Sequence, residues 1–178
     1  MKSKDIILAV TVLSISLVLI SLIESCIPKK NINSKPEVVE NIPVEVVISN
    51  EPFTKEALVK LIRELNLKHP EIVLAQTILE TGDYKSKIFT ENHNLFGMKE
   101  ASSRIHLAKG TRYGHAYYNS WKESVYDYSF YQASYLRGKT KRAYYKYLSS
   151  SYATDPQYTS KLKKLIEENM LKQFFNDK

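Results

Sequence analysis

The sequence predicts a mainly helical α+β domain over residues 53–178. Through most of this stretch, apolar residues recur at the three- and four-residue spacing of a helix face that packs against a core. Residues that favour helix starts and helix ends flank these apolar runs. Between residues 97 and 119 the helical spacing is lost, and glycines and tyrosines there favour loops or a short hairpin.

Four to five helices are expected in this domain, because each apolar run has its own start signal. The residues that cap or open them, in chain order, are Thr54, Pro70, Ser120, Thr140 and the pair Asp155-Pro156. Ser120 and Glu123 have the spacing of a capping box. Gly82 can take the left-handed conformation that ends the second helix. The sequence therefore places Glu80 in the last turn of that helix.

The first 25 residues carry an export pattern. Two lysines precede an uncharged, mainly apolar run over residues 6–23, which is typical of an export signal or a membrane span. The run ends in Leu22-Ile23-Glu24-Ser25-Cys26, which resembles the bacterial lipobox, although Glu24 stands where a small residue is usual. We interpret residues 1–25 as a lipoprotein signal and Cys26 as the lipidated residue, with an uncleaved signal anchor as the alternative. Both interpretations predict an exported, membrane-anchored protein.

Residues 26–52 are expected to form a tether between the membrane and the domain. They contain four of the six prolines and no aromatic residue, so they are semi-extended rather than packed. Cys26 is the single cysteine of the chain, which excludes an intramolecular disulfide and a zinc–thiolate site.

The net charge of +7 suits an anionic partner, and the charge stays at +7 without residues 1–25. Outside the cytoplasm this partner is a cell-wall polymer or a membrane surface rather than nucleic acid. The histidines His93, His106 and His115 do not share ligand spacing on one element, so no metal is expected. The sequence indicates no other cofactor and no oligomer.

Glu80 is the strongest candidate for chemistry. It ends an apolar helix beside a glycine turn and shares a helix face with Gln76. The negative end of the helix dipole and burial would both raise the pKa of Glu80. A protonated glutamic acid can donate its proton to a departing glycosidic oxygen. Position alone also fits a solvated glutamate at a helix end, and without further signals that interpretation would be preferred.

Four segments together favour the catalytic interpretation. They are Ala75-Gln76-Thr77-Ile78-Leu79-Glu80-Thr81-Gly82, Asn94-Leu95-Phe96-Gly97-Met98-Lys99, Ser120-Trp121-Lys122-Glu123-Ser124-Val125-Tyr126-Asp127-Tyr128 and Tyr152-Ala153-Thr154-Asp155-Pro156-Gln157-Tyr158. In this order and spacing they resemble the glucosaminidase-domain family of peptidoglycan hydrolases, which includes flagellar muramidase-like domains and autolysins. The resemblance covers about residues 54–172. It implies a lysozyme-like fold, cleavage of the glycan strand at N-acetylglucosamine, and a catalytic glutamate at Glu80.

The resemblance also implies substrate-binding residues. Tyr152 and Tyr158 are expected near the acetamido group or beneath the sugar, with Gln76, Asn94 and Phe96 at or near the cleft. Phe96 fits a core position equally well. Asp155 is interpreted as a helix cap. The tyrosines of the third helix (Tyr126, Tyr128, Tyr131 and Tyr135) are interpreted as packing residues because they follow helical spacing.

The sequence departs from the family pattern in the expected hairpin. Many members carry a second acidic residue there, but residues 109–119 contain none, and Glu100, Glu123 and Asp127 are unconvincing substitutes. A mechanism with two enzymic carboxylates is therefore poorly supported. An endo-β-N-acetylglucosaminidase assisted by the substrate's own N-acetyl group and a lytic transglycosylase both need only Glu80. A wall-binding module without turnover, and an enzyme for another N-acetylglucosamine polymer such as chitin, are further alternatives.

Overall fold

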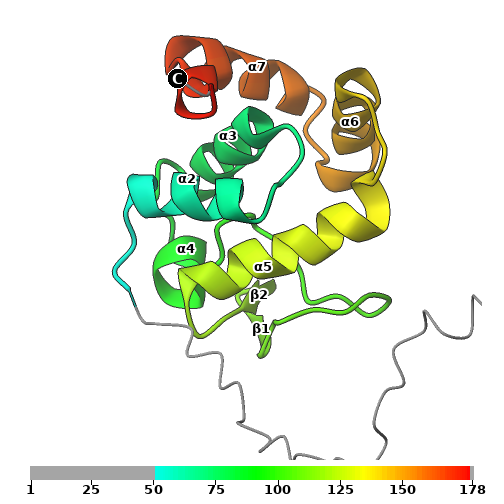
Figure 1. Ribbon diagram of the computed structural model, residues 1–178. Coiled ribbons are helices and arrows are strands. Elements are labelled where there is room, and N and C mark those ends of the chain that lie inside the picture. The colour runs from blue at the N-terminus through cyan, green and yellow to red at the C-terminus, as the bar shows by residue number, and fades with distance from the viewer. Residues whose placement is uncertain (1–50, 177–178) are drawn as a thin grey trace, which may run out of the picture. The chain divides into compact units, whose positions relative to one another are not determined.

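The computed structural model describes residues 51–176, which belong to one compact unit (Figure 1). The expected signal segment, Cys26 and all but the last two residues of the expected tether lie outside the described residues. Within the described range, no helix has both the length and the apolar character needed to cross a membrane.

The described residues fold into six α-helices, three shorter helical turns and one hairpin. The α-helices are α2 (Lys55–Glu64), α3 (Pro70–Thr81), α4 (Lys87–Asn92), α5 (Trp121–Tyr131), α6 (Lys141–Tyr147) and α7 (Tyr158–Glu168). The turns are the π-helical η1 (Gln132–Leu136) and η2 (Leu148–Tyr152) and the 3₁₀-helical η3 (Leu171–Phe174), and the strands are β1 (Gly110–Arg112) and β2 (His115–Tyr117). The predicted mainly helical α+β fold is therefore confirmed.

Most of the predicted helix ends are correct because the capping side chains form the expected bonds. Thr54, Ser120 and Thr140 each accept a backbone N–H from the residue three positions later, and Pro70 opens α3. Gly82 ends α3 at φ +55°. Pro70 and Gly82 set the length of α3 and place Glu80 in its last turn.

Two local features differ from the prediction. Helix α7 begins at Tyr158 rather than at Pro156, because Asp155 holds a turn before the helix: its Oδ1 accepts the N–H of Gln157 at 2.8 Å. Helix α4 was not predicted. It is short, and its N-cap Ser86 accepts the N–H of Phe89 at 3.2 Å, but six residues are too few for a clear apolar period.

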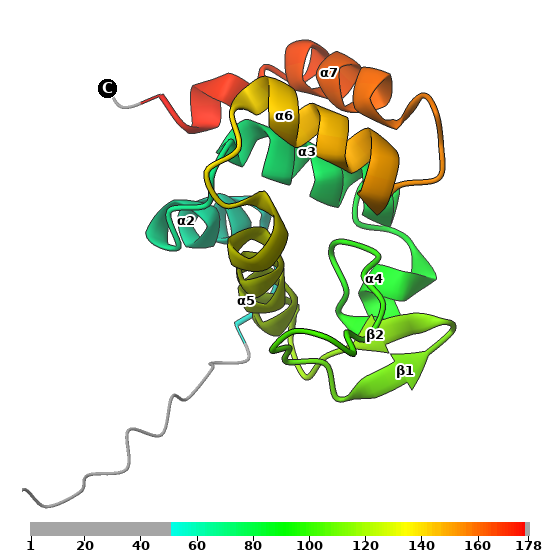
Figure 2. The ribbon, with the colours of Figure 1, turned by 90° about the vertical axis from the view of Figure 1, so that its right-hand side faces the viewer.

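Helix α3 forms the centre of the domain. It contacts α2, α4, α7 and η3, and residues Ile72 to Ala75 are fully buried. A helix that is apolar on all sides is expected to be covered on all sides. Figures 1 and 2 show the hairpin and α4 at the end of the domain opposite α7, with α5 between these ends.

The predicted hairpin is present and is tied to the helices by buried amides. β1 and β2 pair antiparallel, and the turn residues Tyr113 and Gly114 both have positive φ, at +54° and +76°. The side-chain amide of Asn92 donates to the carbonyl of Arg112 at 2.8 Å, and that of Asn94 donates to the carbonyl of Ala116 at 2.9 Å. The hairpin is thus a fixed part of the domain.

Candidate active site

A cavity of about 780 Å³ brings together segments that are far apart in the sequence. It is bounded by the end of α3, the loop over residues 96–104, the last turn of α5 with η1, and residues 151–158. Glu80 is the residue that α3 contributes to its lining. The end of the central helix therefore opens into this cavity.

Both oxygens of the Glu80 carboxyl group are held closely. The Tyr158 hydroxyl donates a hydrogen bond of 2.6 Å to Oε1. Oε2 lies against the backbone of Gly97, where an added Cβ atom would be only 2.9 Å away. Gly97 also has φ +61°, a conformation that favours glycine. The Asn-Leu-Phe-Gly segment thus needs its glycine to let the loop approach the carboxyl group.

Burial raises the pKa of Glu80 above its ordinary value, and this effect outweighs two opposing ones. The hydrogen bond from Tyr158 and the charge of His115 each lower the pKa, because they favour the carboxylate. The same group is therefore easier to protonate than a solvated glutamate, and a donor is already in place for the anion that forms when the proton leaves. This is the behaviour required of a general acid.

A chain of buried hydrogen bonds extends behind Tyr158. The Gln76 amide donates to the Tyr158 hydroxyl at 3.3 Å, and the Gln76 carbonyl oxygen accepts from the Tyr128 hydroxyl at 2.7 Å. Gln76 and Tyr128 are fully buried. The Tyr158 hydroxyl oxygen accepts from the Gln76 amide, so the hydroxyl hydrogen points to Glu80. Gln76 therefore lies behind the cavity wall and not among the residues that line it.

The far end of this chain is closed by further polar groups. The hydroxyls of Tyr128 and Tyr144 are 2.7 Å apart, and the Gln132 amide donates to Tyr144 at 3.1 Å. The Gln132 carbonyl oxygen accepts the N–H of Lys68 at 2.7 Å. The chain begins at the Gln132 amide, which donates, and ends at the Glu80 carboxyl group, which accepts. Each tyrosine hydroxyl between them can therefore donate toward Glu80.

The residues of the Asn-Leu-Phe-Gly segment shape the loop beside Glu80. The Asn94 side chain donates to the Met98 carbonyl at 2.9 Å and accepts the N–H groups of Phe96 and Met98 at 3.2 Å each. Asn94 is buried and does not line the cavity. Phe96 is 1% exposed and stacks on Tyr128, with ring centroids 4.0 Å apart. The Tyr152 hydroxyl donates to the Phe96 carbonyl at 2.6 Å, which joins the loop to the opposite wall.

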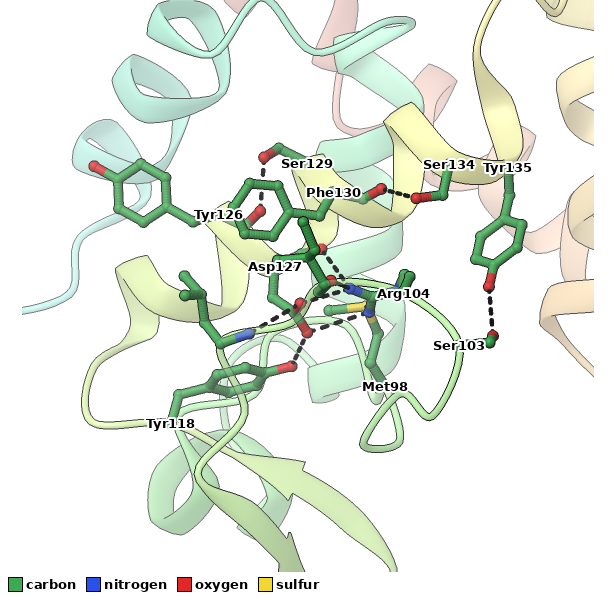
Figure 3. Close-up of polar contacts among 12 residues, drawn as sticks. Met98, Ser103, Arg104, Tyr118, Tyr126, Asp127, Ser129, Phe130, Ser134 and Tyr135 are labelled. Atoms are coloured by element: carbon green, nitrogen blue, oxygen red, sulfur yellow. Dashed lines mark hydrogen bonds and ion pairs between the residues drawn. The ribbon is translucent and has the colours of Figure 1, made fainter.

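A buried ion pair holds the outer part of this loop against α5 (Figure 3). Arg104 Nη1 and Asp127 Oδ1 are 2.6 Å apart, and their side chains are 5% and 1% exposed. The Tyr118 hydroxyl donates to Asp127 Oδ2 at 2.7 Å, and the N–H of Leu107 donates to Oδ1 at 3.3 Å. Both carboxylate oxygens of Asp127 thus accept hydrogen bonds that anchor the loop. The loop has no periodicity, so the sequence alone offered no signal for Arg104.

Two other acidic residues line the cavity, and the carboxylate of each accepts hydrogen bonds from neighbouring groups. Asp155 accepts from Lys161 at 2.6 Å and from the N–H of Gln157, and these bonds lower its pKa. Glu100 Oε2 accepts from the Thr111 hydroxyl at 2.9 Å. Burial raises the pKa of Glu80, whereas the bonds of Asp155 lower its pKa. The interpretation of Asp155 as a structural residue agrees with its bonds.

The histidines are separate in the structure. His93 Nδ1 lies 2.9 Å from the Tyr118 carbonyl oxygen, and His115 Nδ1 lies 2.9 Å from the Tyr113 carbonyl oxygen. In the range 51–176, no three His, Cys, Asp or Glu side chains are grouped as a metal site. His115 lines the cavity, where its charge acts on Glu80.

The sequence missed two cavity-lining tyrosines. Tyr131 and Tyr135 line the cavity, and Tyr135 is 37% exposed, whereas both were interpreted as packing residues. The interpretation is correct for Tyr128, which is fully buried. The difference arises where α5 passes into the π-helical turn η1, because a π turn changes the direction in which successive side chains point.

This combination of a mainly helical domain, a cavity and a half-buried glutamic acid at a helix end defines a lysozyme-like class of domain. Residues 55–171 match the glucosaminidase family, described as mannosyl-glycoprotein endo-beta-N-acetylglucosaminidase, and the chain belongs to that family.

Individual relatives support the fold. An N-acetylmuramoyl-L-alanine amidase domain-containing protein of Staphylococcus aureus (strain NCTC 8325 / PS 47) is 31% identical over 135 residues, which are 62% of this chain and 22% of the relative. The crystal structure of an N-acetylmuramoyl-L-alanine amidase from Staphylococcus aureus is similar at a TM-score of 0.56 and 28% identity, over 69% of this chain and 42% of that chain. A peptidoglycan hydrolase from Sphingomonas sp. A1 gives a TM-score of 0.51 and 28% identity, over 67% of this chain and 92% of that one. The chain thus spans only about a fifth of the curated relative.

Proposed function

We propose that this protein is an endo-β-N-acetylglucosaminidase that cleaves peptidoglycan glycan strands, with Glu80 as the general acid. The proposal rests on the position, the pKa and the hydrogen bond of the Glu80 carboxyl group. Glu80 lines a cavity of about 780 Å³, burial raises the pKa of its carboxyl group, and Tyr158 donates to that group at 2.6 Å. Glycoside cleavage requires an acid of this kind beside the departing oxygen.

The proposed reaction has two steps. Glu80 gives its proton to the glycosidic oxygen while the bond from that oxygen to the anomeric carbon breaks. The Tyr158 hydroxyl stabilises the carboxylate that remains. The substrate's own acetamido oxygen attacks the anomeric carbon, and water then opens this intermediate and returns a proton to Glu80. The overall reaction consumes one water and restores the enzyme.

The choice of peptidoglycan rests on the family and on the relatives. Family membership supports a glycosidic bond at N-acetylglucosamine, and one relative is described as a peptidoglycan hydrolase. The description of other relatives as amidases applies to longer proteins, of which this chain matches 22% and 42%. An amidase would separate stem peptide from glycan and would leave the glycan strand intact.

A lytic transglycosylase is the second candidate, because a single raised-pKa acid serves it equally well. In that reaction the 6-hydroxyl of a muramic acid residue attacks in place of water, and the bond at muramic acid breaks. Glu100 and Asp155, the other acids of the cavity, both hold hydrogen bonds to the protein, which weakens the case for a second enzymic carboxylate.

Mass spectrometry of fragments released from purified peptidoglycan tests both reactions. The full-length protein is compared with Glu80→Gln, which keeps the size of the side chain and an oxygen for Tyr158. The proposal expects reducing N-acetylglucosamine ends from the unmutated protein and none from the variant. Anhydromuramic ends would select the transglycosylase, and free stem peptides would select an amidase. Sedimentation with peptidoglycan but no cleavage by either protein would leave a wall-binding module.

We also propose that the protein is exported and membrane-anchored through Cys26, as the sequence pattern favours. The anchor would hold the enzyme beside the wall, and the basic charge suits an anionic polymer there. Mass analysis of the N-terminal peptide tests the proposal. A lipid on Cys26 that Cys26→Ser removes would support it, whereas an unmodified Cys26 in an intact N-terminal segment would favour the signal-anchor alternative.

A further inference from the structure

Four tyrosine rings form a continuous row along the cavity, starting at the candidate catalytic carboxyl group. The row begins at Tyr158, which donates to Glu80, and continues through Tyr152, Tyr131 and Tyr135. Successive ring centroids are 5.9, 5.6 and 5.0 Å apart. All four rings line the cavity. The row therefore reaches well beyond the position of one sugar ring at Glu80.

Exposure increases toward the far end of the row. Tyr158 is 4% exposed and Tyr135 is 37% exposed. A tyrosine that serves only the core is normally covered, as Tyr128 is in the preceding helix α5, whereas Tyr135 keeps an accessible surface inside a cavity. Helical spacing does not explain this, because Tyr135 belongs to the π-helical turn η1, and such turns occur often at functional sites.

The structure holds the exposed ring in position. The Tyr135 hydroxyl lies 3.3 Å from Ser103 Oγ on the opposite loop, as Figure 3 shows. The loop itself is held by Arg104, which pairs with Asp127 and whose guanidinium lies 5.7 Å from the centroid of the Tyr131 ring. A ring that is fixed in advance loses little freedom when a ligand binds.

We propose that Tyr135, supported by Tyr131, is a second sugar-binding position that stacks on a pyranose ring of the glycan strand away from the cleaved bond. An aromatic face is flat and apolar and suits the C–H face of a sugar, while the phenol hydroxyl remains bonded to Ser103. The inference rests on the proposed glycan substrate. It adds that affinity depends on strand length, because only a strand long enough to reach from Glu80 to Tyr135 gains this contact.

Binding measurements on the full-length Glu80→Gln protein test this inference without any cleavage. The ligands are glycan strands freed of stem peptides and separated by length, and binding is followed by calorimetry. In the parent variant, affinity is expected to increase once the strand reaches Tyr135. Adding Tyr135→Ala should remove this increase and weaken the binding of long strands about fivefold to tenfold, which corresponds to about 1–1.4 kcal/mol. Binding of the shortest strands should not change.

Three further variants separate the ring from other causes. Tyr135→Phe keeps the ring and should keep the length dependence, and Ser103→Ala should do the same. Tyr113→Ala removes another exposed tyrosine, 49% exposed and outside the cavity lining, and should bind all strands like the parent. Thermal unfolding confirms that each variant is folded.

Equal affinity of the parent for short and long strands would overturn the inference. The inference would also be overturned if Tyr135→Phe and Ser103→Ala weakened the binding of long strands as much as Tyr135→Ala does. The hydrogen bond between Tyr135 and Ser103, and not the aromatic ring, would then carry the effect. Failure of the proposed function is visible separately. An unmutated protein that cleaves no glycan, but whose length-dependent binding is lost in Tyr135→Ala, would reject the glucosaminidase and keep the sugar-binding position.

Discussion

The hydroxyl of Tyr158 donates a 2.6 Å hydrogen bond to Glu80, although the two residues are 78 positions apart in the chain. The bond favours the carboxylate of Glu80, while burial favours the protonated acid and dominates. Glu80 therefore combines two properties of a general acid. It holds a proton more readily than a solvated glutamate, and it has a donor ready for the charge that follows proton release.

Tyr158→Phe should raise the pKa of Glu80 further, because the variant removes a bond that lowers it. The high-pH limit of activity reports loss of the proton from the acid, so this limit should move to higher pH. The rate at its optimum should fall about tenfold to a hundredfold, as the developing carboxylate loses its donor. Rate measurements across pH check both effects.

Gln76→Met provides the companion experiment, because Gln76 acts on Glu80 only through Tyr158. It should move the high-pH limit in the same direction, by less, and should have no further effect on this limit in a protein that already carries Tyr158→Phe. An additional shift in the double variant would contradict the arrangement of the hydrogen-bond chain.

Gly97→Ala should abolish most activity while leaving a folded domain. The new Cβ atom would lie 2.9 Å from Glu80 Oε2, and the residue would also be strained at φ +61° by about 1–2 kcal/mol. The carboxyl group must move, and a displacement of this size at a reacting group is costly for the rate. Fragment release from peptidoglycan and thermal unfolding measure the two effects.

Gly138→Ala is the matched control for Gly97→Ala. Gly138 has φ +71°, but an added Cβ atom there meets nothing within 4 Å. The control should show the same loss of stability and normal activity. Similar activity in the two variants would mean that close contact with Glu80 does not decide the role of Gly97.

Local rules predicted much of the fold, whereas long-range contacts decided the site. The capping residues Thr54, Ser120 and Thr140 act within one helical turn, so the sequence shows them directly. The sequence also singles out Glu80 as a candidate, because the helix end and the family motif lie in one segment. The family motif also indicates Tyr158, but its hydrogen bond to Glu80 depends on packing between distant segments and is visible only in the structure. The same holds for Arg104, which meets Asp127 from a loop without periodicity. Gln76 was placed on the correct helix face, but its depth below the cavity was visible only in the folded chain.

Asp127→Asn should destabilise the domain strongly. It leaves the Arg104 guanidinium buried without a counter-charge, and breaking a buried pair in this way costs about 3–5 kcal/mol. The loop over residues 98–107 also loses its anchor beside the cavity, so KM should rise more than kcat falls. Urea unfolding and steady-state kinetics measure the two effects.

Asp83→Asn is the control for Asp127→Asn, since Asp83 pairs with Lys85 at the surface with side chains 68% and 80% exposed. An exposed pair contributes little, so its loss should change the free energy of unfolding by less than about 1 kcal/mol. Adding Arg104→Met to Asp127→Asn should restore part of the lost stability, because the unpaired charge is removed. If Asp127→Asn is as stable as the control, the ion pair does not anchor the loop.

Glu80→Gln should be more stable than the unmutated protein at neutral pH, and this advantage should vanish in acid. The folded state holds the Glu80 proton more tightly than the unfolded state, whose pKa is near the ordinary value of 4.5. Below pH 4.5 both states are protonated and the charge has no cost. As pH rises through 4.5 toward the higher pKa of the folded state, the unfolded state releases its proton first, so the stability of the unmutated protein falls.

Glu167→Gln should behave oppositely, because the hydrogen bond from Lys172 lowers the pKa of Glu167 and stabilises the folded state only at higher pH. That opposite effect should be small, because the pair is exposed. Chemical unfolding of the three proteins at a series of pH values checks both signs, and a pH-independent difference for Glu80→Gln would show that Glu80 does not hold its proton more tightly when the protein is folded.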